Sequence, residues 1–391
     1  MKAWASCAAL LLAACSSITI SSDFEGASLG RVDRVSETHF RCRVPGQADQ
    51  DGRNRQVTWY SFRLDGARGR EVTIALTDLK GEYDYKSNFG GIDEKTPPVV
   101  SVDQKTWKHL GSRLARDREG GEMTFTVTPE ADRVWVAHIE PYTASRLDRF
   151  LAEIRGRPEL KDEVIGKTVE GRDLHLLTIG RGDRIVWLMC RQHSWESGTS
   201  FVGEGAVRYL LSDEARDLRE RMTFKILPMM DPDGCARGGI RFNRHGYDLN
   251  RNWDTADPAN PESRRLMPEI CAAKQALLKD GAFSLFLTLH NQETGGWLSG
   301  SERHPDLATR FFAALKDKTV LGSAPRAPGP KPARGRATVY EYLQREHGLP
   351  AFILEQGIAH DAILGRLPTS EDRLRFGREL ARVMAELVLA R

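Results

Sequence analysis

A histidine and a glutamate three positions apart follow an apolar run and have the chemistry to hold a metal ion. His193-Ser194-Trp195-Glu196 comes directly after the stretch Ile185–Cys190 and its two polar neighbours. An imidazole nitrogen and a carboxylate oxygen at this spacing can turn toward one point, and this ligand pair suits zinc. A catalytic zinc takes a third protein ligand and keeps one position open. His290, which closes the apolar run Phe283–Leu289, is the candidate third ligand.

A second group of polar residues lies between these two positions, in Asp248-Leu249-Asn250-Arg251. An amide beside a guanidinium is suited to gripping a carboxylate, and arginine can do so with two parallel hydrogen bonds. Asp248 is expected to be a structural acceptor rather than an acid in the chemistry. His245 is a rival metal ligand in the same loop region.

The elements that must position these side chains alternate between buried strands and amphipathic helices. Polar residues follow each of four apolar runs, and ligands of open α/β sheets bind at the carboxyl ends of strands. The pattern predicts an α/β domain over residues 144–391, with helices on both faces of the sheet. The expected strands are Ile185–Cys190, Phe224–Leu227, Phe283–Leu289 and Ala351–Leu354. The expected helices are Arg146–Arg155, Gly198–Leu211, Glu262–Leu278, Leu307–Lys316 and Asp372–Leu389.

In residues 24–143 the apolar residues are spaced differently, and this pattern predicts a small antiparallel β-sandwich. Val72–Leu76 and Met123–Val127 alternate apolar with polar side chains, as half-buried strands do. Val57–Phe62 and Val134–Ala137 are rich in β-branched and aromatic residues, which strands favour. Two domains of unequal size suit a chain of 391 residues.

Composition excludes some functions and leaves the redox state open. The net charge is only +3, so we expect no nucleic-acid partner. Beyond the first 15 residues the chain has four cysteines with no paired metal-binding spacing, and their disulfide state cannot be read from the sequence. These cysteines are Cys42, Cys190, Cys235 and Cys271.

The N-terminus is typical of a targeting segment. Lys2 precedes a short apolar stretch, Ala8–Ala14, which is too short to cross a bilayer and fits a secretory signal. Leu12-Ala13-Ala14-Cys15 resembles the bacterial lipoprotein signal, in which the cysteine carries the lipid. This predicts a signal over residues 1–15, a tether over 16–23, and export to the outer membrane, facing the periplasm or cell surface. A cleaved signal without a lipid anchor is the alternative.

The order and strand context of several motifs resemble the M14 zinc carboxypeptidases. The β-rich part is similar to the N-terminal domain of the cytosolic carboxypeptidase subfamily, so the resemblance covers nearly the whole chain after the signal. The motifs in the α/β part are His193-x-x-Glu196, Pro232-Asp233-Gly234, Asp248-Leu249-Asn250-Arg251, His290 and Glu355. Those in the β-rich part are Phe24-Glu25-Gly26, Trp59-Tyr60-Ser61-Phe62, Thr77–Gly81 and Glu140-Pro141-Tyr142-Thr143.

The resemblance implies a role for each site residue. His193, Glu196 and His290 would ligate one zinc ion, and Glu355 would be the general base that takes a proton from water. Arg241 would stabilise the oxyanion that forms on the substrate, although Arg237 and Arg244 compete for this assignment. Asn250 and Arg251 would clamp the C-terminal carboxylate of a peptide or protein substrate, which makes the enzyme an exopeptidase.

Two departures from the family pattern lie beside the proposed ligands, and the one at Ser194-Trp195 bears on specificity. Ser194-Trp195 stands where the subfamily usually has Pro-Gly, and Asn291-Gln292-Glu293 is an unfamiliar continuation after His290. We therefore expect substrate specificity to differ from that of the relatives near Trp195. The family's substrate-capping tyrosine is not cleanly placed, with Tyr340 and Tyr342 as candidates; packing in a helix is the simpler account of either.

The sequence as a whole predicts an exported metallocarboxypeptidase of the α/β class. An acidic preference is a further hypothesis, because Arg334 and Arg336 lie in the Pro/Gly-rich stretch Gly322–Arg336 where a basic pocket could form. Two alternatives stay open. One is a zinc amidase or deacylase on the same fold, and the other is a catalytically silent lipoprotein that binds peptides.

Overall fold

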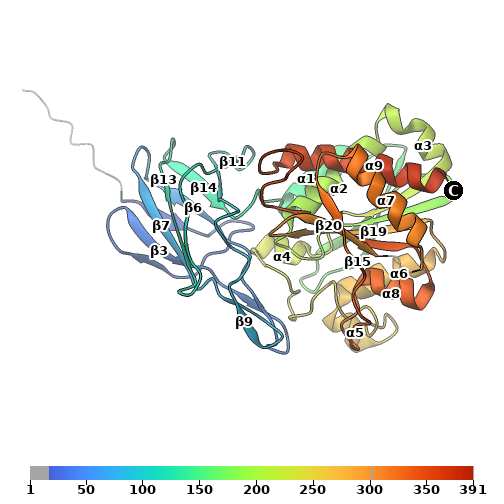
Figure 1. Cartoon of the computed structure of the whole chain (residues 1–391), viewed down its shortest axis with the longest axis horizontal. Helices are drawn as coiled ribbons and strands as arrows, with labels where there is room; N and C mark the ends of the chain where they lie inside the picture. Colours follow the sequence, from blue (N-terminus) through green and yellow to red (C-terminus); the bar gives the residue numbers. More distant parts are fainter. Residues whose placement is uncertain (1–16, 301–302, 391) are drawn as a thin grey trace, which may run out of the picture.

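The computed structural model describes residues 17–300 and 303–390, which form two domains side by side (Figure 1). The predicted signal over residues 1–15, with Cys15, lies outside these residues. Among the helices of the described ranges, none is both long and apolar enough to cross a membrane. The four cysteines of the described part are buried free thiols.

The N-terminal domain is a β-sandwich, as predicted, whose two five-stranded sheets enclose an apolar core. Side chains in β13 alternate between the core and the surface, as the period of a strand requires. The first sheet has the order β1 (Thr19–Ser21), β6 (Ser61–Asp65), β14 (Arg133–Ala137), β10 (Val99–Ser101) and β11 (Lys108–His109). The second has the order β12 (Ala115–Asp117), β13 (Glu122–Val127), β7 (Val72–Thr77), β3 (His39–Arg43) and β2 (Val32–Arg34).

Three details of this domain differ from the expectation. β1 lies within residues 16–23, which were expected to be a tether, because its backbone pairs with β6. β3 and β7 pair in parallel, so the sandwich is not wholly antiparallel. A third, small sheet consists of β4 (Gln47–Ala48), β5 (Arg55–Gln56), β8 (Gly81–Tyr83) and β9 (Lys86–Asn88).

The second domain has one mixed sheet of eight strands. Its centre, β18–β17–β19–β22, is parallel, and the apolar runs in these strands are buried on both faces. Antiparallel strands flank this centre on both sides. The full order is β15 (Leu160–Lys167), β16 (Asp173–Gly180), β18 (Met222–Leu227), β17 (Arg184–Met189), β19 (Leu285–Gln292), β22 (Ala351–Gly357), β20 (Gly296–Gly300) and β21 (Ser323–Pro325).

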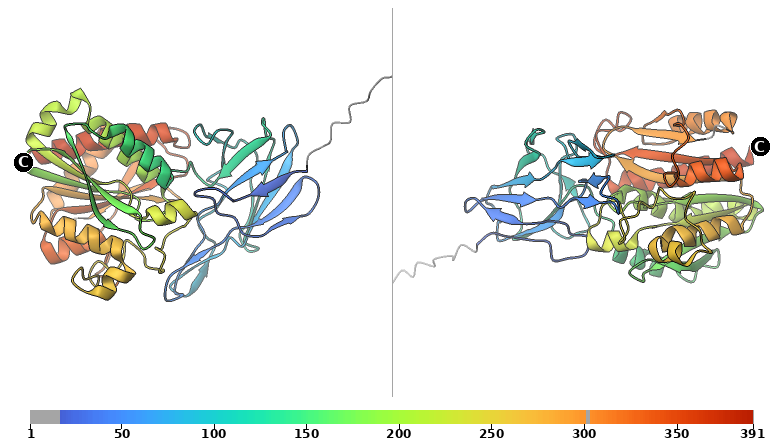
Figure 2. Two further views of the ribbon diagram at one scale, coloured as in Figure 1. Left: turned by 180° about the vertical axis from the view of Figure 1, so that it is seen from behind. Right: turned by 90° about the horizontal axis from the view of Figure 1, so that it is seen from below.

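Helices cover both faces of this sheet, as the alternating pattern predicts (Figures 1 and 2). One apolar layer lies between the sheet and α1 (Ala144–Ile154), α2 (Ser197–Leu210), α7 (Pro305–Lys318) and α9 (Ser370–Leu389). A second layer lies between the sheet and α6 (Pro268–Lys279) and α8 (Val339–His347). The shorter helices are a 3-10 turn (Asp213–Ala215), α3 (Arg216–Arg221), α4 (Pro232–Arg237) and α5 (Pro261–Leu266).

A separate apolar cluster joins the two domains. Trp59 and Ile139 of the sandwich pack with Trp195, Ile240 and Ile358 of the second domain. The Trp195 ring, expected to shape specificity, is 4% exposed and meets His138 edge-on across the interface. The ring therefore packs the loop between His193 and Glu196 against the N-terminal domain, and Trp195 also lines a cavity that both domains share.

Candidate active site

The loop after β17 presents His193 and Glu196, and its backbone is held from inside the protein. Arg191 has a left-handed backbone (φ 59°) and is buried. Its guanidinium donates two hydrogen bonds to the Ser194 carbonyl, at 2.9 and 2.6 Å. Glu196 is the N-cap residue of α2, but its side chain makes no capping bond. That side chain is instead turned toward the two histidines.

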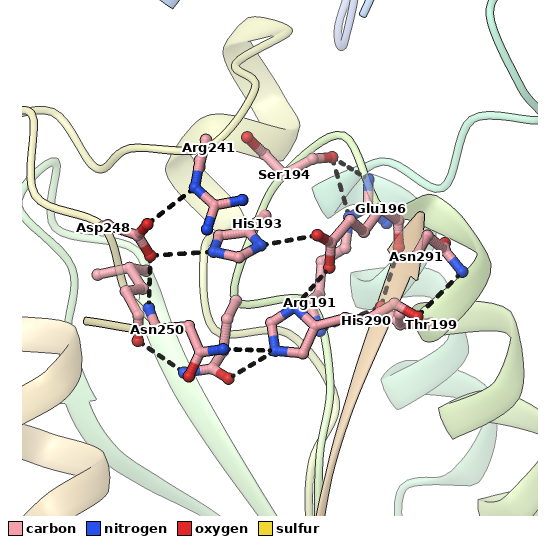
Figure 3. A network of polar contacts seen from close by, with 12 residues as sticks. Arg191, His193, Ser194, Glu196, Thr199, Arg241, Asp248, Asn250, His290 and Asn291 are labelled. Atoms are coloured by element: carbon pink, nitrogen blue, oxygen red, sulfur yellow. Dashed lines mark hydrogen bonds and ion pairs between the residues drawn. The ribbon is translucent and has the colours of Figure 1, made fainter. Parts of the chain in front are cut away.

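Three ligand atoms converge on one point, as Figure 3 shows. Glu196 Oε1 lies 2.7 Å from His193 Nδ1, and Glu196 Oε2 lies 2.9 Å from His290 Nδ1. The three residues are buried, and their ligand atoms all lie within 4.8 Å of one another. The structure thus brings together the three residues that the sequence predicted as zinc ligands.

Neighbouring side chains contact the other nitrogen of each imidazole. His193 Nε2 lies 3.0 Å from Asp248 Oδ1, and His290 Nε2 lies 3.2 Å from Gln192 Oε1. An oxygen acceptor on one ring nitrogen fixes the ring and leaves the other nitrogen to face a metal. Asp248, expected to be a structural acceptor, also accepts hydrogen bonds from the Asn250 backbone and from Arg241 Nε.

The charges around this cluster shift the pKa values of its members. Burial alone would raise the pKa of Glu196, but the two adjacent imidazoles lower it below its usual value. Burial and the Arg241 charge oppose protonation of His193, yet Glu196 and Asp248 raise its pKa. Burial lowers the pKa of His290. The carboxylate between the rings is therefore ionised, which is the state that a metal ligand needs.

Glu355 lies beside His290 because of strand register. In the parallel ladder between β19 and β22, His290 and Glu355 are direct partners. Both residues lie inside their strands, whereas the sequence placed them just after the apolar runs; the ladder continues to the pair Gln292 and Gly357. Burial and the negative charge of Glu196 raise the pKa of Glu355 well above its usual value.

Arg241 is the arginine of its loop that lines the active-site cavity. Its Nε donates to Asp248 Oδ2 at 2.8 Å, which ties it to the His193 side of the cluster. Arg237 and Arg244, the competing candidates, pair with Glu170 instead. The metal-binding group does not include the rival ligand His245.

Asn250 and Arg251 line the same cavity, but the Asn250 side chain is more buried than that of Arg251. The Asn250 amide lies 3.1 Å from His290 Nε2, and its oxygen accepts the Val339 N–H at 3.2 Å. Asn250 is 2% exposed, so its side chain is engaged in the protein. Arg251 donates to the Asn250 carbonyl through Nη1 and is less buried. Arg251 is therefore the more available of the two for a carboxylate.

The cavity has a volume of about 580 Å³ and is lined by both domains. Arg326 and Arg336 line it, but Arg334 lies at a separate, smaller cavity. Tyr340 lines the cavity, whereas the Tyr342 hydroxyl lies 2.9 Å from His347 Nε2 within α8. Lining residues that the sequence did not assign to the site include Gln56, Tyr83, Trp297, Ser299, Thr338, Glu341 and Ile353.

The arrangement fits a zinc ion on its own chemistry. Two imidazole nitrogens and one carboxylate oxygen are the donor set of three-ligand catalytic zinc sites. Both rings have neighbours at the nitrogen that points away from the common centre. His193, Glu196 and His290 are therefore the residues that would hold the metal.

Two family models match the chain in the order of its domains. The model described as zinc carboxypeptidase matches residues 147–298, which carry the proposed ligands. The model described as the N-terminal domain of cytosolic carboxypeptidases matches residues 20–139, which form the sandwich. The three proposed ligands, Arg241 and the Asp248–Arg251 motif lie within the first match, whereas Glu355 lies beyond its end.

Individual proteins are also similar to this chain, over most of its length. An uncharacterized protein of Zymomonas mobilis is 28% identical, over 74% of this chain and 72% of its own length. Mouse cytosolic carboxypeptidase 6 is 29% identical over 67% of this chain, which spans only half the length of that relative. The crystal structure of a metallo-carboxypeptidase from Burkholderia cenocepacia superposes with a TM-score of 0.82 at 26% identity, covering 96% of this chain and 99% of that one.

Proposed function

This chain belongs to the zinc carboxypeptidase family, and we propose that it removes the C-terminal residue from peptides or proteins by metal-dependent hydrolysis. The observation that carries the proposal is the convergence of His193, Glu196 and His290 on one point, with Glu355 as the strand partner of His290. Arg241 and Arg251 line the same cavity.

The three ligands would hold one zinc ion per chain. When bound, zinc lowers the pKa of water and polarises a carbonyl group. Asp248 would keep the His193 ring in the orientation that the metal needs, since its carboxylate lies 3.0 Å from Nε2. The remaining chemistry falls to the residues around this centre.

Glu355 would act as the general base. Its carboxylate would accept a proton from the attacking water and deliver it to the nitrogen of the leaving amine. Arg241 would stabilise the negative charge that develops on the carbonyl oxygen of the substrate, because its guanidinium lines the cavity and is fixed by Asp248. This arrangement supports hydrolysis without a covalent intermediate.

Arg251 would bind the C-terminal carboxylate of the substrate, with Asn250 as its neighbour in the sequence motif. Four arginines line the cavity, and they support an acidic preference for the residue that is removed. They are Arg241, Arg251, Arg326 and Arg336. Of the two arginines that the sequence suggested for this pocket, only Arg336 lies there.

A set of peptides that end in Glu, Lys or Phe, given to zinc-loaded wild type and to Glu355→Gln, tests the proposal. We expect release of the C-terminal residue by the wild type, fastest for Glu, and almost none by the variant. Hydrolysis of the Phe peptide alone would contradict the acidic preference. An Arg251→Ala variant with unchanged turnover would favour an amidase or deacylase that ignores the chain end.

The location of the protein in the cell is a separate proposal from the sequence. The lipoprotein-like signal before Cys15 supports export and a lipid anchor. Metabolic labelling with a fatty acid tests this, because a Cys15→Ser variant should lose the label.

A further inference from the structure

We propose that Gln47, in the N-terminal domain, is a positioning residue for the active-site arginine in the other domain. It would act on the backbone of residues 240–242, which carries Arg241. The inference rests on the proposed function, since it concerns the step in which Arg241 stabilises charge.

The side chain of Gln47 makes four hydrogen bonds to three consecutive residues of the second domain. Its Oε1 accepts the N–H groups of Ile240, Arg241 and Phe242, at 3.0, 2.6 and 3.0 Å. Its Nε2 donates to the Phe242 carbonyl at 2.7 Å. Three successive N–H groups aimed at one point form a concave site for a negatively charged or partly negative atom. Here that atom is Oε1 of Gln47, which belongs to the N-terminal domain.

The segment that Gln47 holds has little regular structure of its own. α4 ends at Arg237, and Gly238 follows in the left-handed conformation. The Gly239 N–H donates to the Gly234 carbonyl, and a single bridge joins Phe242 to Asp248. With neither a helix nor a sheet ladder over residues 239–241, the N–H groups of Ile240 and Arg241 take their acceptor from the side chain of Gln47.

A chain of contacts connects Gln47 to the metal-binding histidine. Arg241 Nε donates to Asp248 Oδ2, and Asp248 Oδ1 lies 3.0 Å from His193 Nε2. A shift of the Arg241 backbone therefore moves the guanidinium that lines the cavity. A misplacement of about 1 Å in a catalytic group can cost about 100-fold in rate.

The small sheet that carries Gln47 is docked at a second point. The Gln50 backbone N–H donates to the Gly246 carbonyl at 3.1 Å. Gly246 has φ +84°, and a Cβ added there would lie 2.6 Å from the Gln50 nitrogen, so the approach is close. Gln56 and Tyr83 of this sheet also line the cavity. The sheet thus forms part of the wall of the active-site cavity, and the Gln47 side chain supplies four of its hydrogen bonds to the second domain.

The test uses the full chain with zinc bound, and compares Gln47→Met with Gln50→Ala. Methionine keeps the length of the side chain and removes its amide. The Gln50 side chain bonds to Asp51 on the same hairpin, so its loss leaves the domain contact in place. With the best peptide substrate, we expect Gln47→Met to lower kcat about 10- to 100-fold with KM within about threefold of wild type. Gln50→Ala should match wild type, and zinc content should be unchanged in both.

Two further variants separate positioning from a general loss of structure. Gln47→Glu keeps the acceptor for three N–H groups but sets an oxygen against the Phe242 carbonyl, so its kcat should lie between those of wild type and Gln47→Met. In an Arg241→Ala background, Gln47→Met should have almost no further effect, because the two residues act in one step. An equal loss in both backgrounds, or an unchanged kcat in the single variant, would overturn the inference.

The outcome for the wild type distinguishes this inference from the proposed function. A wild type that releases no C-terminal residue from any peptide overturns the proposed function, and the role of Gln47 with it. An active wild type beside a fully active Gln47→Met overturns only the role of Gln47.

Discussion

In the second domain, a group of charged side chains is buried and bonded together, whereas the described charged side chains of the N-terminal sandwich are exposed or half-buried. His193, Glu196, Asp248 and His290 form one buried network. Among the described residues up to 143, no Asp, Glu, Lys or Arg is buried. Arg43 and Asp78, for example, form an ion pair with both side chains largely accessible.

The difference shows where each domain contributes free energy. Burying a charge is costly unless partners surround it, so a network such as that around Glu196 is retained for chemistry rather than for stability. The sandwich has an uninterrupted apolar core and can stabilise the fold. At the interface, Trp59 and Trp195 belong to one apolar cluster, so the sandwich supports the loop that carries the ligands.

Of these predictions, Glu355→Gln should have the largest effect on activity. A small effect would contradict the view that the buried charges of the second domain serve catalysis. Removing the general base should lower kcat/KM by about 10²–10⁴-fold, as expected for loss of acid–base catalysis. Peptide hydrolysis measures the rate, and metal analysis provides the control. A variant with normal zinc content and normal turnover would mean that the buried carboxylates are not catalytic.

Trp59→Ala should show that the interface carries stability to the active site. The indole is 3% exposed and donates a hydrogen bond to the Gly26 carbonyl at 3.0 Å. Its loss should lower the free energy of unfolding by about 3–5 kcal/mol. Denaturant titration measures this change. If the variant were as stable as wild type, the two domains would be energetically independent.

Paired aspartate variants sharpen the contrast between buried and surface charge. Asp248→Asn should weaken zinc binding about 10- to 100-fold, because it alters the partner of His193 Nε2. Asp65→Asn, which loses contacts to Arg63 and Arg133 in the sandwich, should leave zinc affinity unchanged and cost at most about 1 kcal/mol. Competition with a chelator measures the affinity. Similar effects of the two variants on zinc would contradict the comparison.

A further prediction concerns pH and the buried His138 at the interface. Among the described residues, neither of its ring nitrogens has a hydrogen-bond partner, and burial lowers its pKa from 6.5 to about 3. Because the unfolded chain takes up a proton first, the stability that neutral His138 contributes is complete above pH 6.5 and is lost as the pH falls toward 3. The slope is about 1.4 kcal/mol per pH unit.

A His138→Phe variant tests this slope, since phenylalanine cannot take up a proton. Its free energy of unfolding should fall less steeply than that of wild type between pH 6 and 4 in urea titrations. Parallel pH dependences for the two proteins would show that His138 is protonated in the folded state.

The central strands of the second domain could be predicted because they are apolar on both faces. β17, β19 and β22 each contain a continuous apolar run, β18 is apolar at four of its six positions, and the helices between them are amphipathic. β15 was not predicted, since most of its side chains are exposed or half-buried and give no clear period. The helix expected over Glu262–Leu278 is divided at Pro268, which begins α6.

The site was predictable where chemistry is concentrated in short motifs, and not where distant segments meet. His193 and Glu196 belong to one motif, His290 closes an apolar run, and a resemblance identified Glu355. Gln47 contacts residues almost 200 positions later in the chain, and no local pattern marks a side chain for such a contact. The same holds for Trp195, whose partners in the sandwich depend on how the two domains dock.

The pairing of His290 with Glu355 has a consequence for how this chain can change in length. Loops in the long connection between the two strands can gain or lose residues without moving the pair, because the ladder between β19 and β22 sets its spacing. One residue inserted within β22 before Glu355 would turn its carboxylate to the opposite face, where Leu354 now packs in the apolar layer below α2 and α9. Tolerance to insertion is thus confined to the loops between these strands and is close to zero within them.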